Sequence, residues 1–105
     1  MDRIEKITRH SEVSEKAIER YLTDRVRDMG GVCLKYSNPG MAGYPDRVCL
    51  LPGGVTVWIE LKSRDGRLSG IQRIRIAGMR RMGHTVCVCR SRADIDSVLN
   101  GGQTV

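Results

Sequence analysis

The chain has 105 residues, and its 18 Lys and Arg side chains outnumber 12 Asp and Glu, which gives a formal net charge of +6. This length suits one domain, and no apolar stretch approaches the roughly 20 residues of a membrane span, so we exclude a transmembrane role and expect no membrane partner. The charged N-terminal residues carry no secretion signal, so we expect a cytoplasmic protein.

Charge and composition narrow the possible partners. Residues 61–105 hold nine basic and three acidic side chains, whereas residues 1–60 hold nine of each. This excess indicates a phosphate-bearing partner or a solvated surface, and charge alone leaves both open. The aromatic content of 4% argues against a platform that stacks single-stranded bases. The four cysteines lack zinc-site spacing, and we expect Cys87 and Cys89, which alternate with Val, to be small buried thiols in a reducing compartment.

The first expected helix follows a polar segment. For residues 1–13 we expect a loose arm or a short extra helix, because this segment offers few apolar positions. Ser14 is the expected N-cap of a helix that ends at Gly30-Gly31. Its apolar face is expected to comprise Ile18, Leu22, Val26 and Met29.

Three strands are expected next. Residues 32–36 read as the first strand, and a Gly- and Pro-rich loop follows it. Residues 46–51 and 55–61 read as a hairpin joined by Pro52-Gly53-Gly54. In the last of these strands we expect Trp58 to pack against the first helix.

The remaining chain predicts a helix, a strand and a short helix. Ser69 and Gln72 match a capping box at the start of a helix from about Gly70 to Gly83. A strand over residues 84–89 and a helix over residues 93–99 follow, ahead of a flexible tail over residues 101–105. The order is therefore α-β-β-β-α-β-α in an α/β domain over residues 14–100. The apolar positions at helical spacing in the second helix are Ile71, Ile74, Ala77, Gly78 and Met82.

The hairpin carries the residues that are candidates for catalysis. A three-residue loop would pair Leu51 with Val55 and place Asp46 directly opposite Glu60, on one face that Lys62 shares. A two-residue loop would turn Asp46 away from Glu60. Gly54 favours the three-residue loop because glycine readily takes the left-handed conformation that closes it.

Two opposed carboxylates repel unless a cation lies between them. Mg²⁺ prefers oxygen ligands and is commonly held by one or two carboxylates together with substrate phosphate, so Asp46 and Glu60 are candidate metal ligands. Lys62 could orient a water molecule or stabilise charge that develops on a phosphate. The pattern indicates phosphodiester hydrolysis. Taken separately, a PD turn and an exposed ExK strand are weak signals.

An ordered series of segments resembles one known family. Together these segments cover roughly residues 14–99; they are SEKAIERYL, the following GG, SNPGMAGYPDR, LLPGG, WIELK and LSGIQ. The chain resembles the virus-type replication-repair nuclease (VRR-NUC) domain of the PD-(D/E)xK superfamily. The resemblance implies a restriction-endonuclease-like core with a mixed sheet flanked by helices. It also implies that Asp46 and Glu60 bind Mg²⁺, with Mn²⁺ as a substitute, and that Lys62 assists catalysis.

The resemblance implies further site residues. A glutamate of the first helix completes the site; the family pattern favours Glu15, whereas the distance to the Gly-Gly stop favours Glu19. Gln72 matches a Gln position near the family's active site, although the capping box alone could explain it. Candidate contacts to DNA phosphates are Arg64, Arg67, Arg73 and Arg80.

The predicted function is metal-dependent cleavage of DNA. The resemblance implies a homodimer that cuts branched DNA such as four-way junctions, in viral or mobile-element replication, recombination or repair. Two symmetric cuts need two active sites, which a dimer supplies. The alternatives are a monomeric nuclease for flaps, nicks or linear ends, and a basic DNA-binding module without catalysis. We expect no small-molecule cofactor.

Overall fold

A computed structural model describes the backbone of residues 3–101 and the side chains of residues 15–101. The predicted α-β-β-β-α-β-α order is confirmed. The tail beyond residue 101 lies outside the described residues, and the proposed division into arm, domain and tail remains a prediction. The elements are α1 (Arg3–Asp28), β1 (Val32–Lys35), β2 (Arg47–Leu51), β3 (Val55–Leu61), α2 (Gly70–Arg81), β4 (Val86–Cys89) and α3 (Arg92–Leu99).

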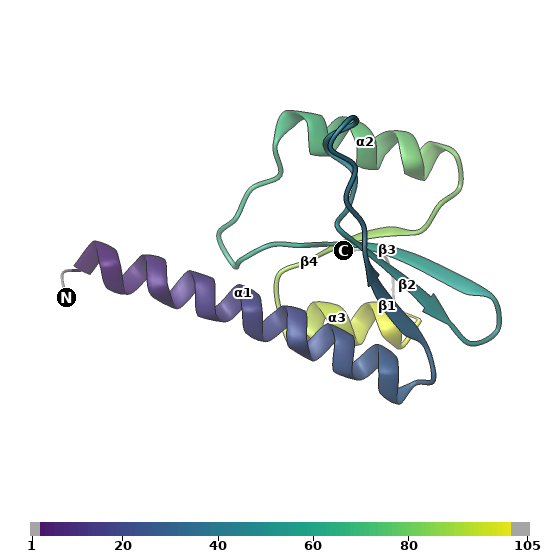
Figure 1. Cartoon of the computed structure of the whole chain (residues 1–105), viewed down its shortest axis with the longest axis horizontal. Coiled ribbons are helices and arrows are strands. Elements are labelled where there is room, and N and C mark those ends of the chain that lie inside the picture. The colour runs from purple at the N-terminus through teal and green to yellow at the C-terminus, as the bar shows by residue number, and fades with distance from the viewer. Residues whose placement is uncertain (1–2, 102–105) are drawn as a thin grey trace.

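One four-stranded mixed sheet forms the centre of the fold, in the order β1-β2-β3-β4. The pairs β1–β2 and β2–β3 are antiparallel, and β3–β4 is parallel with α2 as the connection. Figure 1 shows α1 and α3 on one face of the sheet and α2 on the other. None of the helices in the described part of the chain has the length and apolar character needed to cross a membrane.

The first helix is longer than expected. It begins at Arg3, so Ser14 lies inside it and is not an N-cap. No Gly or Pro interrupts residues 3–28, and nothing local therefore stops the helix from extending. Its C-terminus does follow the expectation: Gly30 takes a positive φ of 87°, and the Gly31 N–H donates to the Val26 carbonyl at 2.9 Å.

Two apolar clusters lie on opposite faces of the sheet. On the α1 and α3 face, Ile18, Leu22 and Val26 are buried as expected, whereas Met29 is exposed. On the α2 face the expected set of apolar positions at helical spacing is wrong, because Ile71, Ile74 and Met82 are exposed. The residues of α2 that are buried, against Val86 and Val88 of β4, are Ile76 and Met79.

The error in α2 has a simple cause. Apolar residues occur around most of this helix, so their spacing does not select one face, and the packing partner decides which face is buried. The expectation that Trp58 packs against the first helix is also wrong, for a related reason. The residue lies on the α2 face, packs with that cluster and meets the Tyr36 ring edge-to-face at 5.3 Å.

Candidate active site

The hairpin register brings two acidic residues together. Leu51 pairs with Val55 and Arg47 pairs with Ile59, so the three-residue loop is confirmed and one further step places Asp46 opposite Glu60. Gly54 closes the loop with a positive φ of 74°, as its sequence position predicts. Side chains alternate along a strand, so both carboxylates belong to the face that carries Trp58.

Glu60 is a buried acid with a perturbed pKa. The residue is only 5% exposed, although it lies at the end of a strand beside a polar loop. Burial, and then the nearby Asp46 carboxylate, raise its pKa from 4.5 to about 7, while Lys62 acts in the opposite direction. A carboxylate kept here against such a cost is typical of a functional site.

Asp46 is held by the backbone at the start of β2. Its carbonyl accepts the Tyr36 N–H at 2.8 Å, and the Leu61 backbone acts to lower the pKa of its carboxyl group. The residue as a whole is exposed, yet burial of its carboxyl group raises its pKa. The charge of Glu19 acts in the same direction, so Asp46 and Glu60 both stand in an environment that disfavours their anions.

Lys62 directly follows β3 and brings a cation to the two acids. Its backbone N–H donates to the Cys89 carbonyl at 3.0 Å, which fixes its position against the end of β4. The side chain is half-buried, and its positive charge lowers the pKa of Glu60. The structure therefore brings Asp46, Glu60 and Lys62 to one end of the sheet.

The two candidate acids of α1 have different surroundings. Glu19 forms an ion pair with Arg47, whose side chain is 8% exposed. Glu15 is exposed, takes part in no ion pair among the described residues, and its charge raises the pKa of Glu60. The charges of both glutamates therefore act on the acidic pair, Glu15 on Glu60 and Glu19 on Asp46, and only Glu19 is paired with a neighbouring arginine.

Arg47 was not recognised as a site residue in the sequence. It follows Asp46 and therefore points to the opposite face of the sheet, toward α1, where it reaches Glu19. Its Nε atom is buried without a hydrogen-bond partner. The basic residue directly after PD, combined with strand alternation and a helix acid, is the signal that could have identified this pair.

Gln72 forms the expected capping box. Its side-chain oxygen accepts the Ser69 N–H at 2.9 Å, and the Ser69 hydroxyl accepts the Gln72 N–H at 3.2 Å. No interaction that the structure describes connects Gln72 with Asp46 or Glu60. Its catalytic role remains a prediction.

The four candidate phosphate-binding arginines occupy different places. Arg64 and Arg67 are exposed in the loop after Lys62, and Arg73 is exposed near the start of α2. Arg80 lies about 10 Å further along that helix. Its guanidinium donates to the Val86 carbonyl at 2.7 and 3.1 Å, where β4 begins, so the structure does not bring it to the end of the sheet that holds Lys62.

The acidic pair suits a hard divalent cation. Within residues 15–101, no group of three or more His, Cys, Asp or Glu side chains could hold a metal ion by itself. Asp46 and Glu60 instead offer a pair of carboxylates, of which Glu60 is buried with a raised pKa, and a cation would relieve their repulsion. Mg²⁺ is often held by such a pair, with water and substrate phosphate as further ligands.

The loop that precedes Asp46 is fixed to α2. The Arg75 guanidinium donates to the Ala42 carbonyl at 3.1 Å and lies over the Tyr44 ring at 5.1 Å from its centre. Gly43 has a φ of 98°, and a Cβ there would come within 2.8 Å of Ile71, so the loop approaches the helix closely. These contacts restrict the position from which Asp46 enters β2.

Comparison with known proteins gives a consistent result. A protein named "Putative nuclease p44", from Acyrthosiphon pisum secondary endosymbiont phage 1, is 34% identical over 87 residues, which cover 83% of this chain and 92% of that protein. A solved structure named "VRR_NUC domain" is 27% identical with a TM-score of 0.77, over 83% of this chain and 95% of that one. A second, named "VRR_NUC domain protein", is 16% identical with a TM-score of 0.64, over 83% and 85%, and supports the fold alone. No family model matches the sequence.

Proposed function

The chain belongs to the VRR-NUC family of nucleases, and on this premise we propose that it is a divalent-metal-dependent endonuclease that cuts branched DNA. The observation that carries the proposal is the cross-strand placement of Asp46 and Glu60, with Glu60 buried and its pKa raised to about 7. The proposal includes a cytoplasmic setting in viral or mobile-element replication, recombination or repair.

In this proposal Asp46 and Glu60 hold a Mg²⁺ ion, for which Mn²⁺ substitutes. When bound, the ion supplies positive charge that draws a phosphate and a water molecule together. Lys62 stabilises the negative charge that develops on the phosphate, because its positive charge acts on the acidic site, as its effect on the pKa of Glu60 indicates. Burial of Glu60 keeps its carboxylate in place and strengthens its interaction with cations.

We assign the first-helix acid of the site to Glu15. Both glutamates act on the acidic pair, since Glu15 raises the pKa of Glu60 and Glu19 raises that of Asp46, but only Glu15 has no ion-pair partner among the described residues. Glu19 instead neutralises Arg47, which is a structural role. Matched Glu15→Gln and Glu19→Gln variants separate the two roles: Glu15→Gln is expected to lower the cleavage rate at unchanged stability, and Glu19→Gln to lower stability. The reverse pattern would contradict the assignment.

Cleavage of labelled DNA tests the proposed activity. Four-way junction, flap and linear duplex substrates are incubated with Mg²⁺, Mn²⁺ or EDTA. We expect paired symmetric cuts in the junction with either metal and none with EDTA, and no cleavage by Asp46→Asn or Glu60→Gln. Asp28→Asn, at the exposed C-terminal end of α1, is the matched control and should cut as the wild type does.

The remaining outcomes assign other functions. Metal-dependent cutting of flaps or linear ends, without junction cleavage, would retain the nuclease and refute the branched-DNA selectivity. Salt-sensitive DNA binding without cutting in either metal would refute the nuclease activity and favour a basic DNA-binding module without catalysis.

Chain mass in solution tests the dimer. One chain provides one acidic site, and two symmetric cuts at a junction need two such sites. Size-exclusion chromatography with light scattering is therefore expected to give twice the mass of one chain. A monomeric mass for a protein that still cuts DNA would favour the flap, nick or linear-end nuclease.

A further inference from the structure

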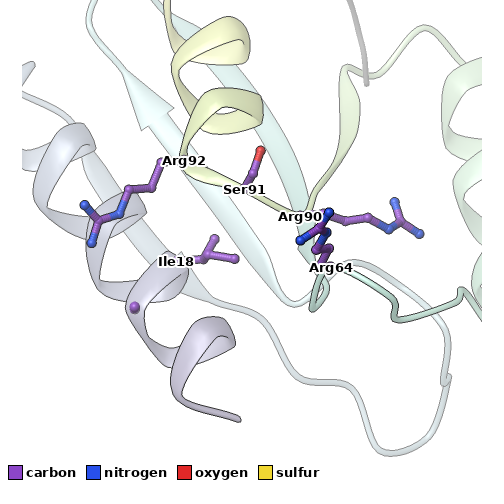
Figure 2. Close-up of a pocket in the computed structure, with 6 residues that line it drawn as sticks. Ile18, Arg64, Arg90, Ser91 and Arg92 are labelled. Atoms are coloured by element: carbon purple, nitrogen blue, oxygen red, sulfur yellow. The ribbon is translucent and has the colours of Figure 1, made fainter. Parts of the chain in front are cut away.

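A cavity of about 670 Å³ opens between α1, the loop after β3 and the turn between β4 and α3. Figure 2 shows Arg92 on the side of α1, with Arg64 and Arg90 toward the opposite side. The residues that line the cavity are Ala17, Ile18, Arg64, Arg90, Ser91 and Arg92, and we call it the arginine pocket.

The three arginines of this pocket are not paired with carboxylates. None of them takes part in an ion pair within the described part of the chain. The Arg90 guanidinium donates to the Gly66 carbonyl at 3.0 Å, and the Arg92 guanidinium lies over the Tyr21 ring at 5.2 Å from its centre. These contacts position two of the cations, and the pocket carries positive charge on both of its sides, which favours an anion between them.

Three acids lie near the pocket, and none of them forms an ion pair with its arginines in the part of the chain that the structure describes; Asp96, one turn after Arg92, pairs with Arg25 instead. Asp94 accepts the Arg90 backbone N–H at 2.8 Å, which places it at the start of α3. Asp65 follows Arg64 in the loop and is exposed, and it forms no ion pair with a residue that the structure describes.

The arginine pocket adjoins the candidate active site. Lys62 donates its N–H to the carbonyl of Cys89, and Arg90 is the next residue along the chain. Arg64 lies two positions after Lys62, in the loop that leaves β3. A strand whose phosphodiester reached Asp46 and Glu60 would therefore have neighbouring phosphates close to the pocket.

We propose that the arginine pocket binds a phosphate group of the DNA strand next to the bond that is cut. The inference rests on the proposed function, and it adds a second anchoring point for the substrate. Guanidinium groups bind phosphate oxygens in a paired geometry, which suits Arg64 and Arg90, and the Ser91 hydroxyl can donate a further hydrogen bond. Such a contact would fix the position of the strand without reading its sequence.

DNA affinity in EDTA tests the pocket independently of catalysis. The Kd of a labelled junction is measured by fluorescence anisotropy at several salt concentrations, for wild type, Arg64→Gln and Arg92→Gln. Each variant is expected to weaken binding on the order of tenfold and to reduce the salt slope by about 1. Arg64 and Arg92 are both exposed, so these changes should leave folding intact, which circular dichroism checks.

Arg27→Gln is the matched control, because Arg27 is a 71% exposed guanidinium at the C-terminal end of α1. It should bind DNA nearly as the wild type does. Parallel substrates with phosphorylated or hydroxyl ends identify the source of the phosphate. An equal loss of affinity on both substrates indicates an internal phosphodiester, and a loss confined to phosphorylated ends indicates a terminal phosphate.

Two results would overturn the inference, and they are distinguishable. If the wild type cuts DNA and both pocket variants keep its Kd and salt slope, phosphate binding in the pocket is refuted. The nuclease proposal would then still stand. Absence of DNA binding and cutting by the wild type would refute both.

Discussion

Replacement of Glu60 by glutamine is expected to stabilise the metal-free protein above pH 7. The raised pKa means that the folded chain binds this proton more tightly than the unfolded chain does. The stability associated with the proton is present below pH 4.5 and is lost as the pH rises through about 7. The difference between 4.5 and about 7, at 1.36 kcal/mol per pKa unit, corresponds to about 3 kcal/mol.

Urea unfolding in EDTA between pH 4 and 8 measures this difference. The free energy of unfolding of Glu60→Gln, relative to the wild type, should rise by about 3 kcal/mol across this range, because glutamine does not titrate. Asp28→Asn, which removes an exposed acid, should show little change. Added Mg²⁺ should stabilise the wild type more than Glu60→Gln. A difference that is independent of pH would refute the claim that burial and Asp46 penalise the Glu60 anion.

Three further predictions concern other contacts. Glu19→Gln is expected to lower the free energy of unfolding by about 1–3 kcal/mol in urea, because the buried Arg47 guanidinium loses its carboxylate. Ser69→Ala is expected to cost about 1 kcal/mol in thermal unfolding, because α2 loses its capping hydroxyl. Cys33 is expected to react with iodoacetamide at a rate that rises through about pH 7, because the Cys49 thiol donates a hydrogen bond to it and Arg47 lies nearby, which together lower its pKa to about 7. Peptide mapping should find Cys49 unmodified, since that hydrogen bond and burial raise its pKa.

For each of these predictions, a specific result would contradict it. Unchanged stability in Glu19→Gln would show that Arg47 does not depend on its partner. An unchanged melting temperature in Ser69→Ala would refute the contribution of the capping box. Modification of Cys33 only above pH 8.5, the range of an ordinary thiol, would show that its neighbours do not stabilise the thiolate.

The hairpin could be predicted because its information is local. Pro52-Gly53-Gly54 limits the loop to a few conformations, and strand alternation then carries the register to Asp46 and Glu60. The capping box at Ser69 is equally local, and it is confirmed. The element order follows from such short signals read one after another.

The features that sequence reasoning did not find depend on contacts between distant segments. The buried face of α2 is chosen by β4, and the partner of Glu19 lies on β2, 28 positions along the chain. Arg90 comes near Lys62 only because β3 and β4 pair in parallel. Strand pairing of this kind is not visible in the spacing of residues within one element.

The parallel pair of β3 and β4 also has a consequence for the order of folding. Asp46 and Glu60 are fourteen positions apart and meet through a short turn, so little chain entropy is lost when they come together. Lys62 and Cys89 are separated by a loop and all of α2, and this contact closes more slowly. We expect the acidic pair to assemble in the hairpin before β4 docks, so that the repulsion between its carboxylates opposes an early step of folding as well as the folded state.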